Sequence, residues 1–345
     1  MNPWLYAVVA VVPGATIAGF LTGSTLWAWG APAFVFGLMP LIEILSPEPR
    51  ENVSDERAMS ELRGLRYDLP IFFAIALHAV TLTLFFGRIT DFEGWTLVGL
   101  VVSTGLSCGA LGINIGHELG HRRGRWHQLL AKLMLSTSLY SHFFVEHNRG
   151  HHARVGTDRD PATARRGEWL FGFWLRSSLG GLLSAWRLEA DRLGRIKRSA
   201  WSWGNEVLRW QVGQGIGLAL IATLGGVELL ALFIVAALGG AALLETVNYL
   251  EHYGLVRGHN QDGRLEPVRP VHSWNSNAVL SRLFLFELSR HSDHHAHPRR
   301  AYAALRHFDE SPQLPTGYPG MILLALVPPL FIAMMDARLD GMEVA

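Results

Sequence analysis

Six long runs of apolar residues limit what this chain of 345 residues can fold into. Each run carries one charged residue at most and reaches about 18 residues or more, which lets an α-helix cross a bilayer. Buried helices of soluble proteins are usually shorter and apolar on one side only. The sequence therefore predicts an all-α integral membrane protein with six transmembrane helices, over residues 4–22, 26–45, 69–87, 94–116, 210–227 and 229–250.

The charges between the runs indicate how these helices are oriented. The runs form three hairpins, and the hairpin connections hold only one basic residue, Arg88. The long connections before the third run and after the fourth are rich in arginine: Arg50, Arg57, Arg63, Arg66, Arg122, Arg123 and Arg125. Because basic loops stay in the cytoplasm, we expect these connections and both termini there. A second run follows the first at once, so we expect a retained anchor rather than a cleaved signal peptide.

Composition excludes several kinds of site. The chain has one cysteine, Cys108, inside an apolar run, so disulfides, cysteine-rich zinc sites and cysteine-ligated iron–sulfur clusters are excluded within it. The formal net charge of +1 gives no indication of nucleic-acid binding. Residues 1–116 are nearly all apolar, whereas residues 117–345 are mostly polar. We expect a four-helix transmembrane region and a histidine-rich region to which the hairpin 210–250 belongs.

Three further segments are apolar but are not expected to cross the bilayer. A crossing at residues 129–145 would put histidine motifs on opposite sides of the membrane, so we expect a cytoplasmic-side or re-entrant helix packed on the bundle. Residues 171–188 mix tryptophan with arginine, which is typical of a helix in the membrane interface. Residues 321–335 are interrupted by Pro328 and Pro329, which predicts an interfacial or docking helix.

Nine of the 16 histidines fall in four short motifs, HELGH, EHNRGHH, NYLEHYG and RHSDHH. Three motifs contain an i, i+4 pair, which a helix presents on one face. By the predicted topology all four motifs reach the same side of the membrane. Neutral imidazole is a common metal ligand, whereas clustered imidazolium groups would repel one another. The sequence therefore predicts a metal site held by His117, His121, His147, His151, His152, His252, His291, His294 and His295.

Nine histidines indicate two metal ions, since one ion takes about four to six ligands. Imidazole suits zinc, copper, iron and nickel. HELGH also fits the zinc-protease motif, with Glu118 as the base, but a zinc hydrolase needs only three protein ligands. A metal transporter would place its ligands near the middle of the bilayer rather than at one end. A pair of iron ions that activates O₂ is the kind of site that would employ all nine histidines as ligands.

Metal-bound histidines need hydrogen-bond partners for their second ring nitrogen. Carboxylates inside or next to the motifs are the candidates, and they are Glu118, Glu146, Asp158, Asp160, Glu251 and Asp293. Glu251 and Asp293 stand out, because one precedes a predicted ligand and the other stands between two. The remaining histidines, among them His142 and His297, are expected to be ordinary core or surface residues.

The motifs resemble those of the integral-membrane alkane hydroxylases of the AlkB family, which are non-haem di-iron monooxygenases. EHNRGHH and NYLEHYGL fit the family pattern, while HELGHR has Arg122 in place of lysine and LSRHSDHHAHP has Ser289 in place of glutamine. The segments DPATARRGE, HSWNSN and LPTGYPGMILLALVPP look similar too, so the resemblance runs over about residues 116–336. Desaturases and fatty-acid hydroxylases share the first two motifs, and the last two separate this family from them.

The resemblance implies terminal hydroxylation of n-alkanes with O₂ at two iron ions, and the nine histidines match the iron ligands. It also implies electrons from NAD(P)H through a reductase and a rubredoxin, and a place in the bacterial inner membrane. Xylene monooxygenases are close relatives, so other terminal methyl groups stay open as substrates. A fused rubredoxin is excluded, because its four cysteines are absent.

An alkane offers no polar group for binding, so the shape of a slot between the first four helices would have to orient it. Bulky residues of the second run, Trp27, Phe34 and Phe36, are candidates for closing that slot. The alternative, with equal weight, is that these side chains face lipid.

Overall fold

The computed structural model describes residues 2–54 and 64–343, and all regular elements of these residues are helices. Arg57 and Arg63, two of the arginines used to orient the chain, lie outside the described residues. The chain divides into two compact units. The first comprises Met1–Leu38, Gly64–Val145 and Ala185–Leu244, and the second Met39–Arg63, Glu146–Ser184 and Glu245–Ala345.

Four helical segments are long and apolar enough to cross a membrane, which supports a membrane protein but not the expected six spans. They are Pro3–Thr22, Leu65–Asp91, Gly94–Gly120 and Glu206–His252. The predicted second run forms only a shorter apolar helix, Gly30–Leu45. Pro32 and Pro40 lack a backbone donor, and the helix between them is π-helical over Ala33–Leu38. The fifth and sixth runs are joined in one helical element.

The helices of the first unit follow the chain in this order: η1 Pro3–Ala10, α1 Val11–Thr22, α2 Thr25–Ala28, α3 Gly30–Pro32, η2 Ala33–Leu38, α6 Leu65–Arg88, η3 Ile89–Asp91, α7 Gly94–Ser107, η4 Cys108–Ile113, α8 Asn114–Gly120 and α9 Arg125–Ser136. The predicted helix at residues 129–145 is thus two, because α9 ends at Ser136 and α10, Phe143–Glu146, follows a turn at Leu139 with φ of 54°. Most of α13, Glu206–His252, also belongs to this unit.

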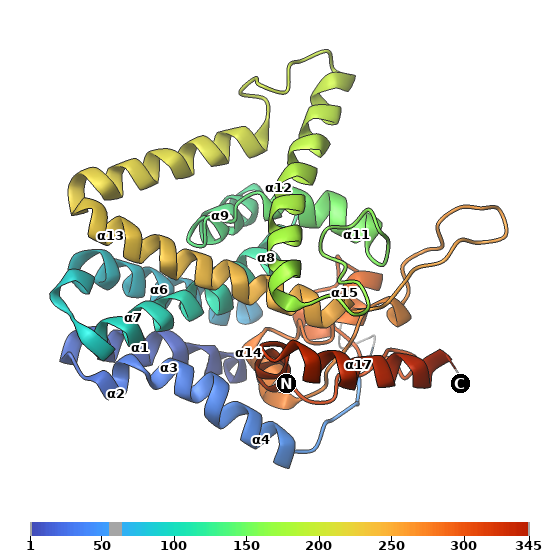
Figure 1. Ribbon diagram of the computed structural model, residues 1–345, viewed down its shortest axis with the longest axis horizontal. Coiled ribbons are helices and arrows are strands. Elements are labelled where there is room, and N and C mark those ends of the chain that lie inside the picture. The colour runs from blue at the N-terminus through green and yellow to red at the C-terminus, as the bar shows by residue number, and fades with distance from the viewer. Residues whose placement is uncertain (1, 55–63, 344–345) are drawn as a thin grey trace. The chain divides into compact units, whose positions relative to one another are not determined.

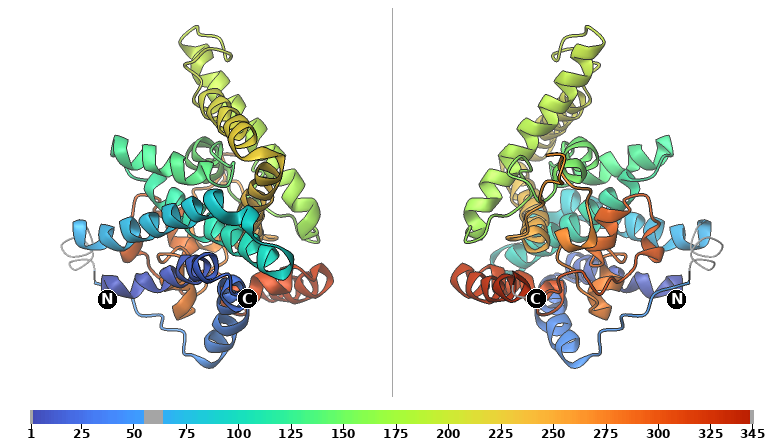
Figure 2. Two further views of the ribbon diagram at one scale, coloured as in Figure 1. Left: turned by 90° about the vertical axis from the view of Figure 1, so that its left-hand side faces the viewer. Right: turned by 90° about the vertical axis from the view of Figure 1, so that its right-hand side faces the viewer.

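One residue divides the 47-residue helix α13 into two arms. Gly226 has φ of 82° and ψ of 173°, a conformation that glycine adopts without steric penalty. The helix turns back on itself at this point (Figure 1; Figure 2). The break that the sequence placed between its fifth and sixth runs is therefore present as a bend.

The core of the first unit is formed by α1, α6, α7 and α13. Phe20, Phe85, Leu100 and Phe233, one from each helix, pack in one buried cluster. Where η4 meets the second arm of α13, small residues let the backbones approach closely, as is common between membrane helices. At Gly240 a methyl group would lie 2.7 Å from Ser138 Oγ and 2.9 Å from Cys108 Cβ.

The second unit contains shorter helices joined by long loops. They are α4 Met39–Leu45, η5 His147–His151, α11 His152–Arg154, α12 Leu170–Arg195, η6 Pro270–His272, α14 Val279–Phe284, α15 His291–Ala296, η7 Tyr302–Ala304, α16 Tyr318–Ala325 and α17 Pro328–Glu343. The end of α12 lies in the first unit, and the last turns of α13 lie in the second. The prolines at 328 and 329 end one helix and begin another, as predicted.

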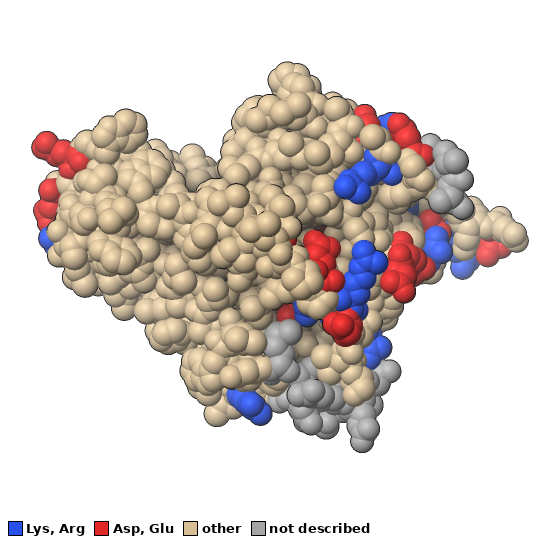
Figure 3. Space-filling view, turned by 90° about the horizontal axis from the view of Figure 1, so that it is seen from below, with Lys and Arg blue, Asp and Glu red and all other residues tan. Residues whose placement is uncertain are grey.

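Large apolar side chains remain exposed along the spans. Leu26 is 80% exposed and Leu224 is 85% exposed. Most of the face drawn in Figure 3 carries no charged side chain. Apolar surface of this extent is expected of helices that face lipid rather than water.

The close packing at Gly240 gives a first prediction. Gly240→Ala should lower the free energy of unfolding by about 1–3 kcal/mol, because Ser138 and Cys108 leave no room for a methyl group. Thermal denaturation of the detergent-solubilised protein measures this. Gly239→Ala is the control, since a methyl group there would meet nothing closer than 3.9 Å. Equal melting temperatures of the two variants would contradict the packing described.

Candidate metal centre

Four buried histidines of the second unit bring ring nitrogens together. They are His151, His252, His291 and His295, and the nitrogens lie within 4.8 Å of one another. Nε2 of His151 is 3.2 Å from Nε2 of His295, and Nε2 of His291 is 3.2 Å from Nε2 of His252. Nitrogens bound to one ion at about 2.0–2.1 Å lie about 3.0–3.4 Å apart at neighbouring positions. The spacing therefore suits ligands of a shared ion.

Local helix geometry positions these rings. His291 and His295 stand one turn apart on α15, where the i, i+4 spacing works as the sequence predicts. The second motif behaves differently, because His147–His151 is a π-helical turn. Its wider turn aligns residues i and i+5, so His147 pairs with His152, with 3.0 Å between the Nε2 atoms. His151 is left to join the first four-histidine cluster.

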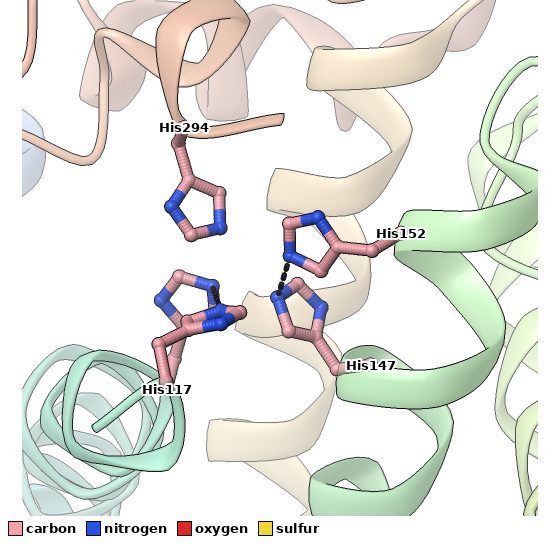
Figure 4. A group of neighbouring side chains, drawn as sticks. His117, His147, His152 and His294 are labelled. Carbon is pink, nitrogen blue, oxygen red and sulfur yellow. Dashed lines mark hydrogen bonds between the residues drawn. The ribbon is translucent and has the colours of Figure 1, made fainter. Parts of the chain in front are cut away.

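A second set of histidines in this unit consists of His147, His152 and His294 (Figure 4). The ring centre of His294 lies 4.9 Å from that of His152 and 5.9 Å from that of His147. In the first unit, His117 and His121 form a pair at the end of α8, with 3.3 Å between their Nε2 atoms. All nine predicted ligands are therefore found in pairs or clusters of imidazole rings.

Two of the predicted carboxylates lie against histidines of the four-histidine cluster. Asp160 Oδ2 is 2.9 Å from His151 Nδ1, and Glu251 Oε1 is 3.1 Å from His291 Nδ1. Burial alone would raise the pKa of Asp160, but the neighbouring His151 and the hydrogen bonds from His151 and Thr163 lower it. A carboxylate at Nδ1 leaves the Nε2 lone pair directed at the cluster.

Three other predicted carboxylates bind arginines instead, and the sixth, Asp158, is exposed. Glu118 and Asp68 both accept hydrogen bonds from Arg122, at 3.2 and 2.6 Å. Glu146 accepts one from Arg154 at 2.7 Å. Asp293, which the sequence analysis favoured, is fully buried and takes hydrogen bonds from the side chain of Arg300 and the amide of Arg306, and it pairs with His297. Buried carboxylates need such partners, because an isolated buried charge is costly.

The predicted slot residues lie in the first unit. Trp27 is 49% exposed on α2, and Phe34 and Phe36 are half-buried on η2. Two residues of the second unit that contact the predicted carboxylates were not predicted from the sequence. Tyr318 donates a hydrogen bond of 2.7 Å to Glu251, and Thr163 donates one of 2.6 Å to Asp160. The signal that could have pointed to them is their position in LPTGYPG and DPATARRG, two segments that resemble the family.

The donor set fits a metal ion of the kind that imidazole binds. His295 is 3% exposed, and within the described part of the chain its Nδ1 has no hydrogen-bond partner. Burial and the neighbouring histidines hold the pKa of His295 well below its usual range. The ring is therefore neutral at physiological pH, which is the form that binds metals.

The contact between Asp160 and His151 gives a second prediction. Asp160→Asn should weaken metal binding by about 10–100-fold, because the carboxylate that orients His151 loses its charge. Competition between the purified protein and a chelator for Fe²⁺ measures the affinity. Asp158→Asn is the matched control from the same loop, since Asp158 is exposed. An equal decrease in Fe²⁺ affinity in both variants would show that the carboxylate of Asp160 does not orient His151 for metal binding.

Comparisons with known proteins agree with this site. Residues 93–325 match the family model described as fatty acid desaturase. The chain is 39% identical to an alkane 1-monooxygenase of Ectopseudomonas oleovorans, over 93% of this chain and 79% of the relative. It is 40% identical to alkane 1-monooxygenase 1 of Alcanivorax borkumensis, over 92% and 79%.

A more distant relative is the hydroxylase component XylM of a xylene/toluene monooxygenase of Pseudomonas putida. It is 27% identical over 97% of this chain and 88% of the relative. The resemblance inferred from the motifs is thereby confirmed. The chain belongs to the fatty acid desaturase family and, within it, to the alkane 1-monooxygenases.

Proposed function

We propose that this chain hydroxylates the terminal methyl group of n-alkanes to 1-alkanols, using O₂ and two iron ions held by its nine clustered histidines. The observation that carries the proposal is the set of four buried ring nitrogens within 4.8 Å of one another, in a chain 40% identical to an alkane 1-monooxygenase. The chemistry that the iron pair would supply is activation of O₂, in which one oxygen atom enters the alcohol and the other leaves as water.

The residues divide into two ligand sets. His151, His252, His291 and His295 would hold one ion. His147, His152 and His294 would contribute to the other site, and His117 and His121 match the remaining ligands of the family by their motif. Asp160 would fix the ring of His151 as the tautomer with a proton on Nδ1, and the carboxylate of Glu251, 3.1 Å from Nδ1 of His291, would favour the same tautomer there. Residues 1–116 would supply the apolar slot, and residues 117–345 the catalytic region.

Six transmembrane crossings remain our proposal for the topology. The first arm of α13, residues 206–225, is about 30 Å long at 1.5 Å per residue, the thickness of a bilayer core. Its second arm would make another crossing, and the helix Gly30–Leu45 a shorter one. With the arginine-rich connections inside, the catalytic face and both termini would lie in the cytoplasm, at the bacterial inner membrane.

Loss of one proposed ligand should abolish the activity. In membranes supplied with a reductase, rubredoxin and NADH, the wild-type chain should convert octane to 1-octanol and contain about two iron ions. His294→Ala should lose turnover and part of the iron. His297→Ala is the control, because this histidine of the same stretch is half-exposed and pairs with Asp293. One zinc ion per chain, or conversion without O₂, would rule the proposal out.

The slot residues should set the length of the substrate. Replacing Trp27, Phe34 or Phe36 with Ala would open space at the end of the slot and shift the products towards longer alkanes. Gas chromatography of the alcohols formed from an equal mixture of alkanes measures the shift. Exposed Leu21, at the end of α1, serves as control. An unchanged profile in all three variants would mean that these side chains face lipid.

The electron donor should bind where basic residues surround the histidine motifs. Arg149, Arg159, Arg165 and Arg299 are exposed in these loops. They would attract a small acidic protein such as rubredoxin, which would receive electrons from NAD(P)H through its reductase. Turnover at limiting rubredoxin should therefore fall several-fold between low and physiological salt. A rate independent of ionic strength would assign these arginines to lipid headgroups instead.

A second candidate substrate is the methyl group of an aromatic hydrocarbon. The similarity to XylM over 97% of the chain favours it. Feeding octane, dodecane and p-xylene side by side to cells that express the chain would decide between the two classes.

A further inference from the structure

Glu251 accepts a hydrogen bond from a tyrosine and lies within ion-pair distance of a histidine. Its Oε1 lies 3.1 Å from Nδ1 of His291 and accepts a hydrogen bond of 2.7 Å from the hydroxyl of Tyr318. All three side chains are at most 2% exposed. A buried carboxylate that loses a donor is free to rotate and is poorly solvated, so each member of such a network matters.

The backbone of Tyr318 is fixed in turn. Tyr318 begins α16, so its amide has no partner within the helix. The amide donates a hydrogen bond of 3.0 Å to Oγ of Ser281. The position of the tyrosine ring therefore depends on α14, which carries Ser281, as well as on its own helix.

A carboxylate in an apolar helix ends the network. Glu43 of α4 accepts a hydrogen bond of 2.6 Å from the amide of Ser281 and another from its hydroxyl. Glu43 is 5% exposed. An ionisable residue in an apolar segment is energetically costly, so its presence there points to a function. A side chain at Gly317, next to Tyr318, would overlap the carboxylate of Glu43. The segment TGYPG thus accommodates Glu43 on one side and presents Tyr318 on the other.

We propose that Tyr318 is a positioning residue for the metal ligand His291, acting through Glu251, and that Glu43 and Ser281 hold Tyr318 in place. The contacts run from Glu43 through Ser281, Tyr318 and Glu251 to His291, all within the second unit. The inference rests on the proposed function, because it treats His291 as a ligand. It gives a purpose to two features that the metal motifs leave unexplained, the glutamate in an apolar run and the TGYPG segment.

The test compares two phenylalanine variants of the full chain in lipid nanodiscs. Tyr318→Phe removes the hydroxyl that holds Glu251. Tyr249→Phe is the matched control, since Tyr249 is equally buried and its hydroxyl donates a bond of equal length, 2.7 Å, to the backbone oxygen of Glu168. The readouts are Fe²⁺ affinity by chelator competition and the Mössbauer spectrum of the iron-loaded protein.

Tyr318→Phe should lose about tenfold in iron affinity and change the quadrupole splitting of one iron, while Tyr249→Phe keeps wild-type values. A purely structural tyrosine would lower the melting temperature in both variants and leave affinity and spectrum alone. That outcome would overturn the proposal.

A second variant tests the contact between Ser281 and the amide of Tyr318 and leaves the tyrosine side chain unchanged. Ser281→Ala removes the acceptor for the amide of Tyr318, so it should lower iron affinity in the same direction by a smaller factor. Unchanged affinity in Ser281→Ala would remove Glu43 and Ser281 from the proposal. Should Tyr318→Phe not fold, Ser281→Ala decides alone, and unchanged iron affinity in that variant would then overturn the whole proposal. A wild-type chain that neither binds iron nor hydroxylates octane would refute the proposed function, whereas an active wild type with an unaffected Tyr318→Phe refutes only this inference.

Discussion

Buried imidazoles must stay neutral and face one another, and the second unit depends on this constraint. An imidazolium at His295 would be buried among other rings, and burial together with those neighbours lowers its pKa well below the usual range. A neutral ring still has one N–H to place. Asp160 accepts a hydrogen bond from Nδ1 of His151, and Glu251 lies 3.1 Å from Nδ1 of His291. The Nε2 atoms of both rings therefore face the cluster. The protein therefore builds a nitrogen-lined site and supports it with carboxylates.

The same region also contains buried carboxylates that contact arginines rather than the clustered histidines. Glu146 and Asp293 lie close in sequence to proposed ligands, yet each is bound by an arginine. Pairing with a guanidinium compensates the charge of each carboxylate. Some carboxylates near the site thus contact histidines, and others form ion pairs with arginines of the surrounding segments. Sequence proximity to a ligand does not distinguish between them.

Local patterns predicted much of the fold and all nine histidines that lie in pairs or clusters. The i, i+4 pair on α15 follows from the period of the α-helix, and Pro328 and Pro329 divide the last apolar segment where expected. The π-helical turn at His147–His151 was not predicted, because a π-turn is seldom favoured by its own sequence and needs support from tertiary contacts. The second run was predicted as one span, but it is interrupted at Trp29, and the shorter helix Gly30–Leu45 that follows contains a π-helical stretch, Ala33–Leu38.

The sequence by itself determined the chemistry of this protein. Long apolar runs indicate a membrane protein, nine histidines in four motifs predict a metal site, and a single cysteine excludes disulfides and cysteine-rich metal sites within the chain. The tertiary structure alone decided which histidines share a cluster, which carboxylates orient them, and that Tyr318 and Glu43 take part. These decisions rest on contacts such as that between Ser281 and Glu43, which are 238 positions apart. Spacing along a chain fixes the neighbours within one helix, whereas only the packing of separate segments brings distant side chains together.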